Sequence, residues 1–419
     1  MAPGTGPWAP LSSGAMSDRP TAPELTGPIF DDPFYAGDPF PHYARLRAEA
    51  PLVWHEDPAM ATGGIWVASR YADVMAVSRD PDRFSSAKGI LAFEVGVEYP
   101  TPPTMMHMDP PEHTRLRQAT ATGFRPSRIR ALEPGVRERV DRLVGALPAG
   151  GSTDIVHGLA APLPLMMICS LLGLPEDDWP TFLEFSDAAI PGAAPLTNER
   201  RAQLMADSER MQREHIARRR TERGEDYVTD LIEAVGNDGE PLGLTDDEIF
   251  VIVNQLFIAG NETTRNLISG GMVALAERAD QWALLRDDPS LIPTAVEELL
   301  RWTTPVVAFM RTATGDTDLG GERIHAGDPV LLLYASANRD EAEFGPDADR
   351  LDVTRRPNHH VAFGFGPHVC VGAALARLEG RVVLEALTGR FATVEVAGTV
   401  DRTPSGIIAG VHRAELRFG

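Results

Sequence analysis

Two short apolar runs stand near the start of the chain, with a segment of turn-forming residues between them. The runs are Pro51–Glu56 and Gly64–Ser69, and Asp57–Gly63 separates them. Runs of this length that are bounded by turn residues are typical of β-strands. We therefore expect two early strands, after which the pattern of the chain becomes mostly helical.

A long helix is predicted in the middle of the chain. Thr245–Glu248 has the T-x-x-E pattern of a capping box, and the chain from Ile249 to Trp282 is compatible with a helix for more than 30 residues. Such a helix would be on the order of 50 Å long, and its apolar faces require burial. Its middle nevertheless carries the polar run Asn261–Thr264, which is costly to bury unless its groups find partners. A conflict of this kind is typical of a functional site.

The last third of the chain mixes helices, strands and one long segment without periodicity. Glu341–His360 is rich in turn residues, and irregular segments of this length are uncommon and often functional. The pattern also predicts a helix at Pro293–Trp302, strands at Val306–Met310 and Val330–Tyr334, and a final helix at about Ala373–Thr388 that ends at Gly389.

Composition and charge narrow the class of protein. The chain has 419 residues, of which 43% are hydrophobic and 24% charged, as in ordinary folded proteins, and its net charge of −21 argues against nucleic-acid binding. No stretch approaches the ~20 apolar residues that span a bilayer. Residues 1–25 are rich in Pro, Gly and Ser and lack the features of a signal peptide. We expect a disordered leader there, a cytoplasmic location and no membrane anchor.

One cysteine stands in a setting that suits metal ligation. The chain has only two cysteines, too few for a disulfide framework or a four-cysteine zinc site, so a reducing compartment is expected. Cys370 lies in the segment FGFGPHVCVG (Phe363–Gly372), just before the last predicted helix. Backbone N–H groups at a helix start can hold a thiolate, and a thiolate directed at haem iron favours O–O cleavage. Taken alone, the segment would also suit a buried, inert cysteine beside a turn.

Two pairs of charged residues have helical spacing. His113 and Arg117 are four residues apart, so they share one helix face and can together bind a carboxylate, although a surface helix with salt bridges has the same spacing. Glu298 and Arg301 are three residues apart on the helix predicted at Pro293–Trp302. We interpret this second pair as structural. If it is buried, removing one partner would cost ~3–5 kcal/mol.

The middle of the long helix is the candidate for catalysis. Gly260 lacks a side chain and leaves room for a small ligand, Glu262 can relay protons, and the Thr263 hydroxyl can hydrogen-bond a ligand or loosen the helical ladder. The alternative is a pair of threonines packed in the helix core and bonded back to carbonyl oxygens.

Four motifs together resemble the cytochrome P-450 family. FGFGPHVCVG matches the family's signature F-G-x-G-x-H-x-C-x-G at every fixed position, and Glu298-Leu-Leu-Arg301 matches its E-x-x-R. Ala259–Thr264 and Asp109–Arg117 resemble its oxygen-activation segment and its propionate-binding helix. The resemblance runs from about Asp31 to the C-terminus. It implies a mainly α (α+β) fold, a helical prism with small β-sheets and a long central helix over the haem, in one domain spanning residues 26–419.

The resemblance also implies roles for individual residues. Cys370 would ligate the iron of heme b, and Gly260, Glu262 and Thr263 would serve oxygen activation. Glu298 and Arg301 would close a buried ion-pair network, with Arg355 as a further candidate member. The residues expected to contact the cofactor are His113, Arg117, Arg311, His368, Phe363, Ala259 and Gly372.

The resemblance further implies a monooxygenase that uses O2 and external electron donors. A ferredoxin and a ferredoxin reductase are expected, because the chain is too short for a fused reductase, and we expect a monomer. Arg115, Arg125 and Arg128 could dock an acidic donor or could equally be solvated surface.

The substrate pocket is predicted to be apolar. Its expected residues are Ile90, Leu91, Phe93, Val306, Val307, Phe309, Ile407 and Ile408, which could instead be core. An apolar lining favours a terpenoid, a steroid or another lipid that is hydroxylated. A polyketide or macrolide in secondary metabolism, or a different oxidative outcome, is the alternative. A haem-thiolate sensor or lipid binder is the non-enzymatic alternative, although such a protein would not need the Glu262–Thr263 pair.

Overall fold

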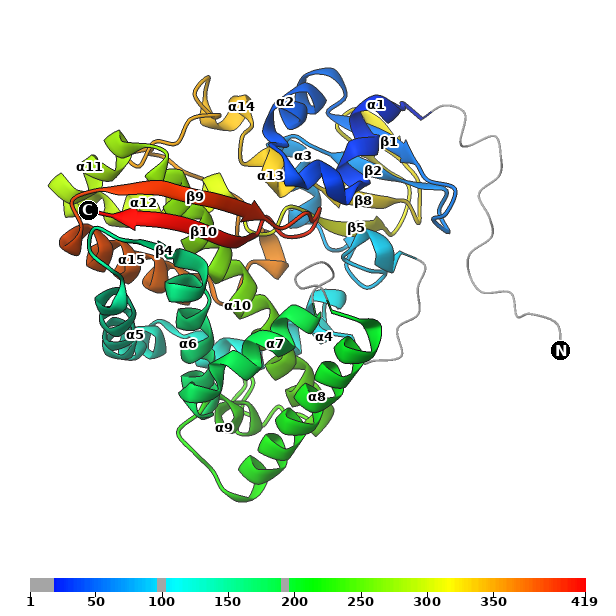
Figure 1. Ribbon diagram of the computed structural model, residues 1–419. Coiled ribbons are helices and arrows are strands. Elements are labelled where there is room, and N and C mark those ends of the chain that lie inside the picture. The colour runs from blue at the N-terminus through cyan, green and yellow to red at the C-terminus, as the bar shows by residue number, and fades with distance from the viewer. Residues whose placement is uncertain (1–18, 96–102, 190–195) are drawn as a thin grey trace.

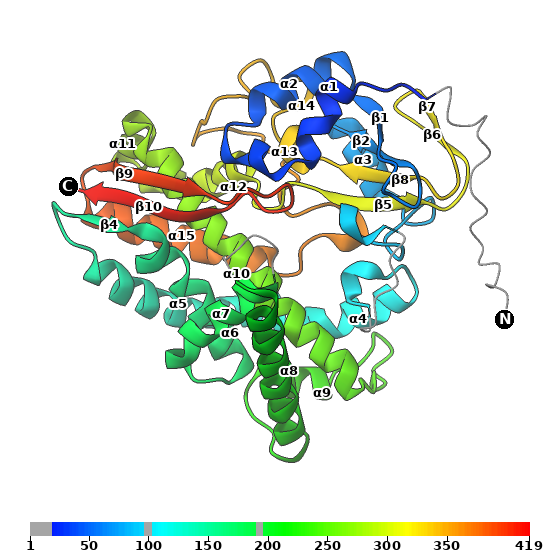
Figure 2. The same ribbon diagram turned by 45° about the vertical axis from the view of Figure 1, so that its right-hand side comes forward.

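The computed structural model describes residues 19–95, 103–189 and 196–419. Helix α10 (Asp246–Ala276) runs through the middle of the molecule, with a five-stranded sheet on one side and α5 to α9 on the other (Figures 1 and 2). The predicted capping box is present: the Thr245 hydroxyl accepts from the Glu248 N–H, and the Glu248 carboxylate accepts from the Thr245 N–H. The helix ends at Ala276, earlier than predicted, because the chain breaks before a separate helix, α11.

The remaining helices surround α10. Within the described residues, no helix combines the length and the apolar character needed to cross a membrane. These helices are α1 (Pro23–Thr26), α2 (Phe40–Glu49), α3 (Tyr71–Arg79), α4 (Glu112–Ala121), α5 (Pro126–Ala146), α6 (Pro162–Leu172), α7 (Trp179–Ala189), α8 (Asn198–Thr221), α9 (Tyr227–Ile232), α11 (Ala279–Asp287), α12 (Ile292–Thr303), α13 (Tyr334–Ala337), α14 (Glu341–Phe344) and α15 (Ala373–Arg390).

The two predicted early strands pair with each other. They are β1 (Leu52–Glu56) and β2 (Gly64–Ala68), antiparallel, and they begin a sheet of order β1-β2-β8-β5-β3. The other members are β8 (Pro329–Leu332), β5 (Phe309–Ala313) and β3 (Phe84–Ser85). The strand predicted at Val306–Met310 was placed three residues too early. Val306 instead forms an isolated bridge with Ile408, and the ladder with β8 begins at Phe309.

Two small sheets complete the fold. One has the order β4-β10-β9, formed by β4 (Ser152–Asp154), β10 (Val411–Phe418) and β9 (Val394–Arg402), and the other is the hairpin of β6 (Thr317–Leu319) and β7 (Glu322–Ile324). The last predicted helix is present as α15, but Gly389 does not end it. The helix continues to Arg390 and is capped at Phe391, which is buried.

The predicted leader is too long at its C-terminal end. Residues 1–18 lie outside the described residues, whereas Arg19 is buried and forms an ion pair of 2.8 Å with Asp328. The Arg19 guanidinium also lies 3.9 Å from the ring centroid of Trp54. A buried ion pair stacked on an aromatic ring fixes this part of the chain. The partners of Arg19 are far away in the sequence, so the local Pro- and Gly-rich composition could not predict that Arg19 is ordered.

The predicted Glu298–Arg301 pair is fully buried. Arg301 donates to both Glu298 oxygens, at 2.7 and 2.8 Å, and its remaining N–H groups donate to the carbonyl oxygens of Asn338, Ala348 and Arg350. The Arg355 Nε lies 3.3 Å from the Glu298 carboxylate. The pair on α12 thus holds the irregular segment predicted at Glu341–His360, which contains one short helix, α14.

Candidate functional site

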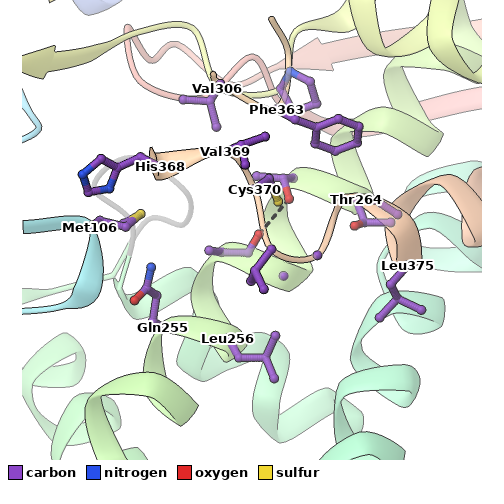
Figure 3. A pocket seen from close by; sticks show the side chains of 18 of the residues that line it. Met106, Gln255, Leu256, Thr264, Val306, Phe363, His368, Val369, Cys370 and Leu375 are labelled. Carbon is purple, nitrogen blue, oxygen red and sulfur yellow. Dashed lines mark hydrogen bonds between the residues drawn. The ribbon is translucent and has the colours of Figure 1, made fainter. Parts of the chain in front are cut away.

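Cys370 lies at the end of a tight loop, three residues before α15 begins. Its N–H donates to the Phe363 carbonyl at 2.8 Å, which closes the loop between these two residues. The cysteine lies deep in the molecule, yet its surface is accessible because it faces a cavity. Figure 3 shows Cys370 beside Val369, with Gln255 and Leu256 projecting from α10 into the same space. The loop therefore presents a thiol to a cavity.

Two glycines of the loop adopt backbone conformations that disfavour other residues. Gly364 and Gly366 have φ values of +67° and +71°. A Cβ at Gly366 would lie 2.2 Å from the Ser78 carbonyl oxygen, so this position also requires close approach to α3. The path of the loop therefore explains why glycine stands at positions 364 and 366 of the motif.

Burial and local polar groups act in opposite directions on the Cys370 thiol. Burial is the largest influence and raises its pKa, while the N–H groups of Gly372 and Ala373 and the charge of Arg117 partly offset this rise. The start of α15 and a cation thus favour the thiolate. Cys169, by contrast, is buried in the core, where burial raises its pKa to about 12. Cys169 is therefore the inert cysteine of the two.

Four cationic or imidazole side chains meet at one side of this cavity. His113 and Arg117 come from one face of α4, as predicted, Arg311 comes from β5, and His368 comes from the Cys370 loop. The rings of His113 and His368 lie 4.3 Å apart. Burial lowers the pKa of His368 to about 3, with further lowering by Arg311, His113 and Arg117. A bound anion beside these side chains would offset both the burial and the repulsion between their charges.

The cavity extends from this cluster along α10. Its empty space is about 1630 Å³, including the part that opens to solvent. The α10 residues that line it recur every three or four positions, which marks one face of the helix. They are Ile252, Gln255, Leu256, Ala259, Gly260, Thr263, Thr264 and Leu267.

Thr263 and Glu262 lie on different faces of α10. Thr263 lines the cavity, and its hydroxyl donates to the Ala259 carbonyl at 2.7 Å. Glu262 is buried away from the cavity and pairs with Arg265 on the same helix. Gly260 lines the cavity, and a Cβ there would meet the side-chain ends of Leu256 and Ile168 at 3.2 and 3.3 Å. Of the three predicted catalytic residues, Gly260 and Thr263 face the cavity directly.

The predicted cofactor contacts all line the cavity, whereas most of the predicted pocket residues do not. All seven predicted cofactor-contact positions line the cavity, namely His113, Arg117, Arg311, His368, Phe363, Ala259 and Gly372. Of the predicted pocket residues, only Ile90, Val306 and Phe309 do so.

The other predicted pocket residues point elsewhere. Phe93 is 53% exposed, and Val307 packs in the core beside the five-stranded sheet. Ile408 is used in the bridge to Val306. Leu91 and Ile407 are partly buried and are not part of the lining. Phe93 lies in a short 3-10 helix (Ala92–Glu94), and the other positions lie in irregular segments, where a shift of one residue changes the direction of a side chain.

Several lining residues were not predicted from the sequence. They include Thr120, Tyr227 and Glu379. Met105, Met106, Gln255 and Leu256 also line the cavity; they lie in two segments, Gly89–Met106 and Gln255–Ala259, that the family resemblance predicts to line the pocket, although none of the four was singled out. The three- to four-residue spacing from Thr263 back to Ile252 would have identified Gln255, whereas Tyr227 and Glu379 reach the site only through tertiary packing.

Heme b fits these residues. A flat cofactor needs close backbone approach, two carboxylates need cations, and iron needs an axial ligand. The loop glycines, the cluster of His113, Arg117, Arg311 and His368, and the Cys370 thiol provide each of these. Among the described residues, the buried Nε2 of His113 has no hydrogen-bond partner in the protein, as expected for a donor that belongs to a bound group.

Comparison with known proteins gives a consistent result. A family model described as Cytochrome P450 matches residues 150–405. Linalool 8-monooxygenase of Pseudomonas putida is 38% identical over 90% of this chain and 95% of that protein. Nocardicin C N-oxygenase of Nocardia uniformis subsp. tsuyamanensis is 40% identical over 90% of this chain and 93% of that protein.

A solved structure shows the same architecture. The structure of CYP108D1 from Novosphingobium aromaticivorans is similar to this one with a TM-score of 0.84 and 33% sequence identity. The match covers 96% of this chain and 99% of the other. The mainly helical fold predicted from the motifs is thereby confirmed.

Proposed function

The chain belongs to the cytochrome P450 family, and on this premise we propose that it hydroxylates a lipophilic substrate and that the Cys370 thiolate would hold the haem iron. Members of this family bind heme b and act as monooxygenases. The observation that carries the proposal is the position of the Cys370 thiol, which faces the cavity that is also lined by one face of α10.

The haem, when bound, supplies the activation of dioxygen for insertion of one oxygen atom into the substrate. The chain contributes the surroundings. Cys370 holds the metal as thiolate, and His113, Arg117, Arg311 and His368 neutralise the propionates. Thr263 holds a hydroxyl at the cavity wall, where it can position a proton, and the apolar side chains around it exclude water.

The apolar lining supports a terpenoid, a steroid or another lipid as substrate. Ile252, Leu256, Ile168, Val306 and Phe309 line the cavity and carry no polar side-chain group. The names of the relatives do not decide the substrate, because one is a linalool monooxygenase and another an N-oxygenase of nocardicin C. Polyketide oxidation and outcomes other than hydroxylation are the alternatives.

Electrons are proposed to come from a ferredoxin and its reductase. Of the arginines considered for docking, Arg115 is paired with Glu248, and Arg128 lies 3.9 Å from Asp230. Arg125 is exposed and is the better candidate contact. A monomeric state and a cytoplasmic location belong to the same proposal.

The first test is spectroscopic. The reduced, carbon-monoxide-bound enzyme is expected to show the red-shifted Soret band of a thiolate ligand. Cys370→Ala should lose this band, and Cys169→Ala should keep it. Loss of the band in Cys169→Ala alone would overturn the assignment of the ligand.

The second test is turnover. With a surrogate ferredoxin and reductase, apolar substrates should yield products that carry one added oxygen atom, in a reaction that consumes O2. A normal haem spectrum without any product from apolar, polyketide or polar compounds would instead indicate a sensor or binder.

A further inference from the structure

One side chain on the cavity face of α10 differs from its neighbours. Gln255 lines the cavity between Ile252, one turn before it, and Ala259, one turn after it. Figure 3 shows its amide directed into the cavity on the side of Met106. An uncharged amide therefore stands beside the apolar side chains of Ile252 and Leu256 on the cavity face of α10.

The Gln255 amide has no hydrogen-bond partner among the residues that the structure describes. Its neighbour Asn254 points to another face of α10, where its side-chain oxygen accepts from the Gln212 amide at 3.1 Å. Thr263 is also satisfied, because its hydroxyl donates to Ala259. Gln255 is thus a polar side chain of α10 whose donors and acceptor are directed at the ligand space, and Thr264, which also lines the cavity, lies more than two turns further along the helix.

An unpaired amide beside apolar groups is unfavourable unless a ligand or water satisfies it. We propose that Gln255 is a specificity-determining residue that hydrogen-bonds one oxygen function, a hydroxyl or a ketone, of an otherwise apolar substrate. This inference rests on the proposed function and narrows the substrate class to lipophilic molecules that carry a hydroxyl or a ketone. An amide both donates and accepts, so it serves alcohols and ketones alike, and it brings no charge to balance a carboxylate or an amine.

The position of Gln255 also sets where the oxygen function lies relative to the oxidised carbon. Gln255 and Thr263 are eight residues apart, which corresponds to roughly 12 Å along the helix axis, and Gly260 is roughly 7.5 Å from Gln255. Because the Gln255 side chain covers part of that distance, the oxygen function should lie roughly 6–10 Å from the carbon that reacts. The substrate would thus be oxidised at a site remote from its existing oxygen.

The test uses pairs of probes that share a carbon skeleton. Cedrol with cedrane, and 5α-androstan-3β-ol with 5α-androstane, are titrated into the haem-loaded enzyme, and the dissociation constants are taken from the spectral change on displacement of the iron-bound water. Gln255→Met removes the amide at nearly constant shape. The ratio of alcohol to hydrocarbon dissociation constants should rise about 3- to 10-fold, as expected for one net hydrogen bond. Gln255→Leu should give the same shift.

Two controls separate this role from a structural one. Ile252→Leu changes the same wall without removing a polar group and should leave the ratio unchanged. Without added ligand, Gln255→Met should unfold at the same temperature as the wild type or a higher one, because it removes an unpaired polar group. A clear fall in both Gln255 variants would show that the amide supports the fold and would overturn the proposal.

The outcomes also separate this inference from the proposed function. If wild type and Gln255→Met bind the alcohols and hydrocarbons in the same ratio, the inference is wrong and the lipophilic pocket stands. If the wild type neither binds nor oxidises any of the four probes, both are overturned. Products of cedrol and 5α-androstan-3β-ol oxidised close to the original hydroxyl carbon would also contradict the inference, since Gln255 would then not hold that oxygen.

Discussion

Glu262 and Thr263 are neighbours in the chain, yet the Thr263 side chain lines the cavity while the Glu262 carboxylate is buried against Arg265. Successive residues of a helix are rotated by about 100°, and Glu262 falls outside the face on which Thr263 and Thr264 line the cavity. Arg265 in turn lies 3.3 Å from Asp187 on α7, whose side chain is 21% exposed. Glu262 therefore belongs to a row of charged side chains, Glu262, Arg265 and Asp187, that leads from α10 to the partly exposed side of α7.

Replacing Thr263 with alanine should separate electron use from product formation. The hydroxyl faces the cavity, and positioned proton donors contribute ~10²-fold or more. Thr263→Ala should bind haem and substrate nearly as the wild type does but form less product per reducing equivalent, with hydrogen peroxide or water in its place. Thr263→Ser keeps the hydroxyl and should stay close to wild type. An unchanged ratio in Thr263→Ala would exclude this hydroxyl from proton delivery.

Removal of Arg265 should destabilise the enzyme more than removal of both charges. Arg265→Met leaves Glu262 buried without a cation, which costs ~3–5 kcal/mol. The double variant Glu262→Gln/Arg265→Met leaves only Asp187, whose side chain is partly exposed, without its partner, and should recover most of the loss. Denaturant unfolding of the haem-loaded proteins measures both values. Equal losses in the single and double variants would mean that the pair is not coupled.

Glu298→Ala and Arg301→Ala should prevent folded, haem-loaded protein from accumulating. Both side chains are fully buried, and Arg301 also holds three carbonyl oxygens of the segment after α13. Removing either partner leaves the other charge buried without a counter-charge, which costs ~3–5 kcal/mol of folding free energy. Yield of haem-loaded protein is the measurement, and Glu49→Ala, which breaks an exposed pair with Arg45, is the control with unchanged yield. A normal yield of Glu298→Ala would contradict the prediction.

The parts of the site that the sequence predicted are those set by short-range geometry. The capping box at Thr245, the spacing of His113 and Arg117, and the Cys370 loop all depend on residues within about ten positions of one another. Each such motif constrains the backbone locally, so its structure could be inferred without knowledge of the rest of the fold.

The parts that were missed depend on contacts between distant segments. Phe93 and Ile407 were expected in the pocket, but Phe93 lies in a short 3-10 helix and Ile407 in a loop, and neighbouring elements set the direction of both side chains. Arg19 was assigned to the leader because its partners Trp54 and Asp328 are far away in the sequence. The burial of Glu262 away from the cavity, by contrast, follows from helix geometry and could have been predicted.

Glu379 gives the stability of the enzyme a specific pH dependence. This residue lies on α15 at the cavity wall, and its buried Oε2 has no partner among the described residues. Burial raises the pKa of its carboxyl to about 8, so the group is protonated in the folded protein and ionised in the unfolded chain over much of the range from pH ~4.5 to 8. Unfolding then releases a proton, and a rise in pH favours the unfolded state. The contribution of Glu379 to the free energy of unfolding should therefore be fully favourable below pH ~4.5 and should fall by up to about 1.4 kcal/mol per pH unit toward pH 8.

The variant Glu379→Gln keeps the shape of the side chain but cannot ionise. The difference in unfolding free energy between Glu379→Gln and wild type, measured in denaturant at several pH values, should thus grow in favour of the variant from pH 5 to 8. A difference that is constant with pH would mean that Glu379 ionises in the folded protein as readily as in water.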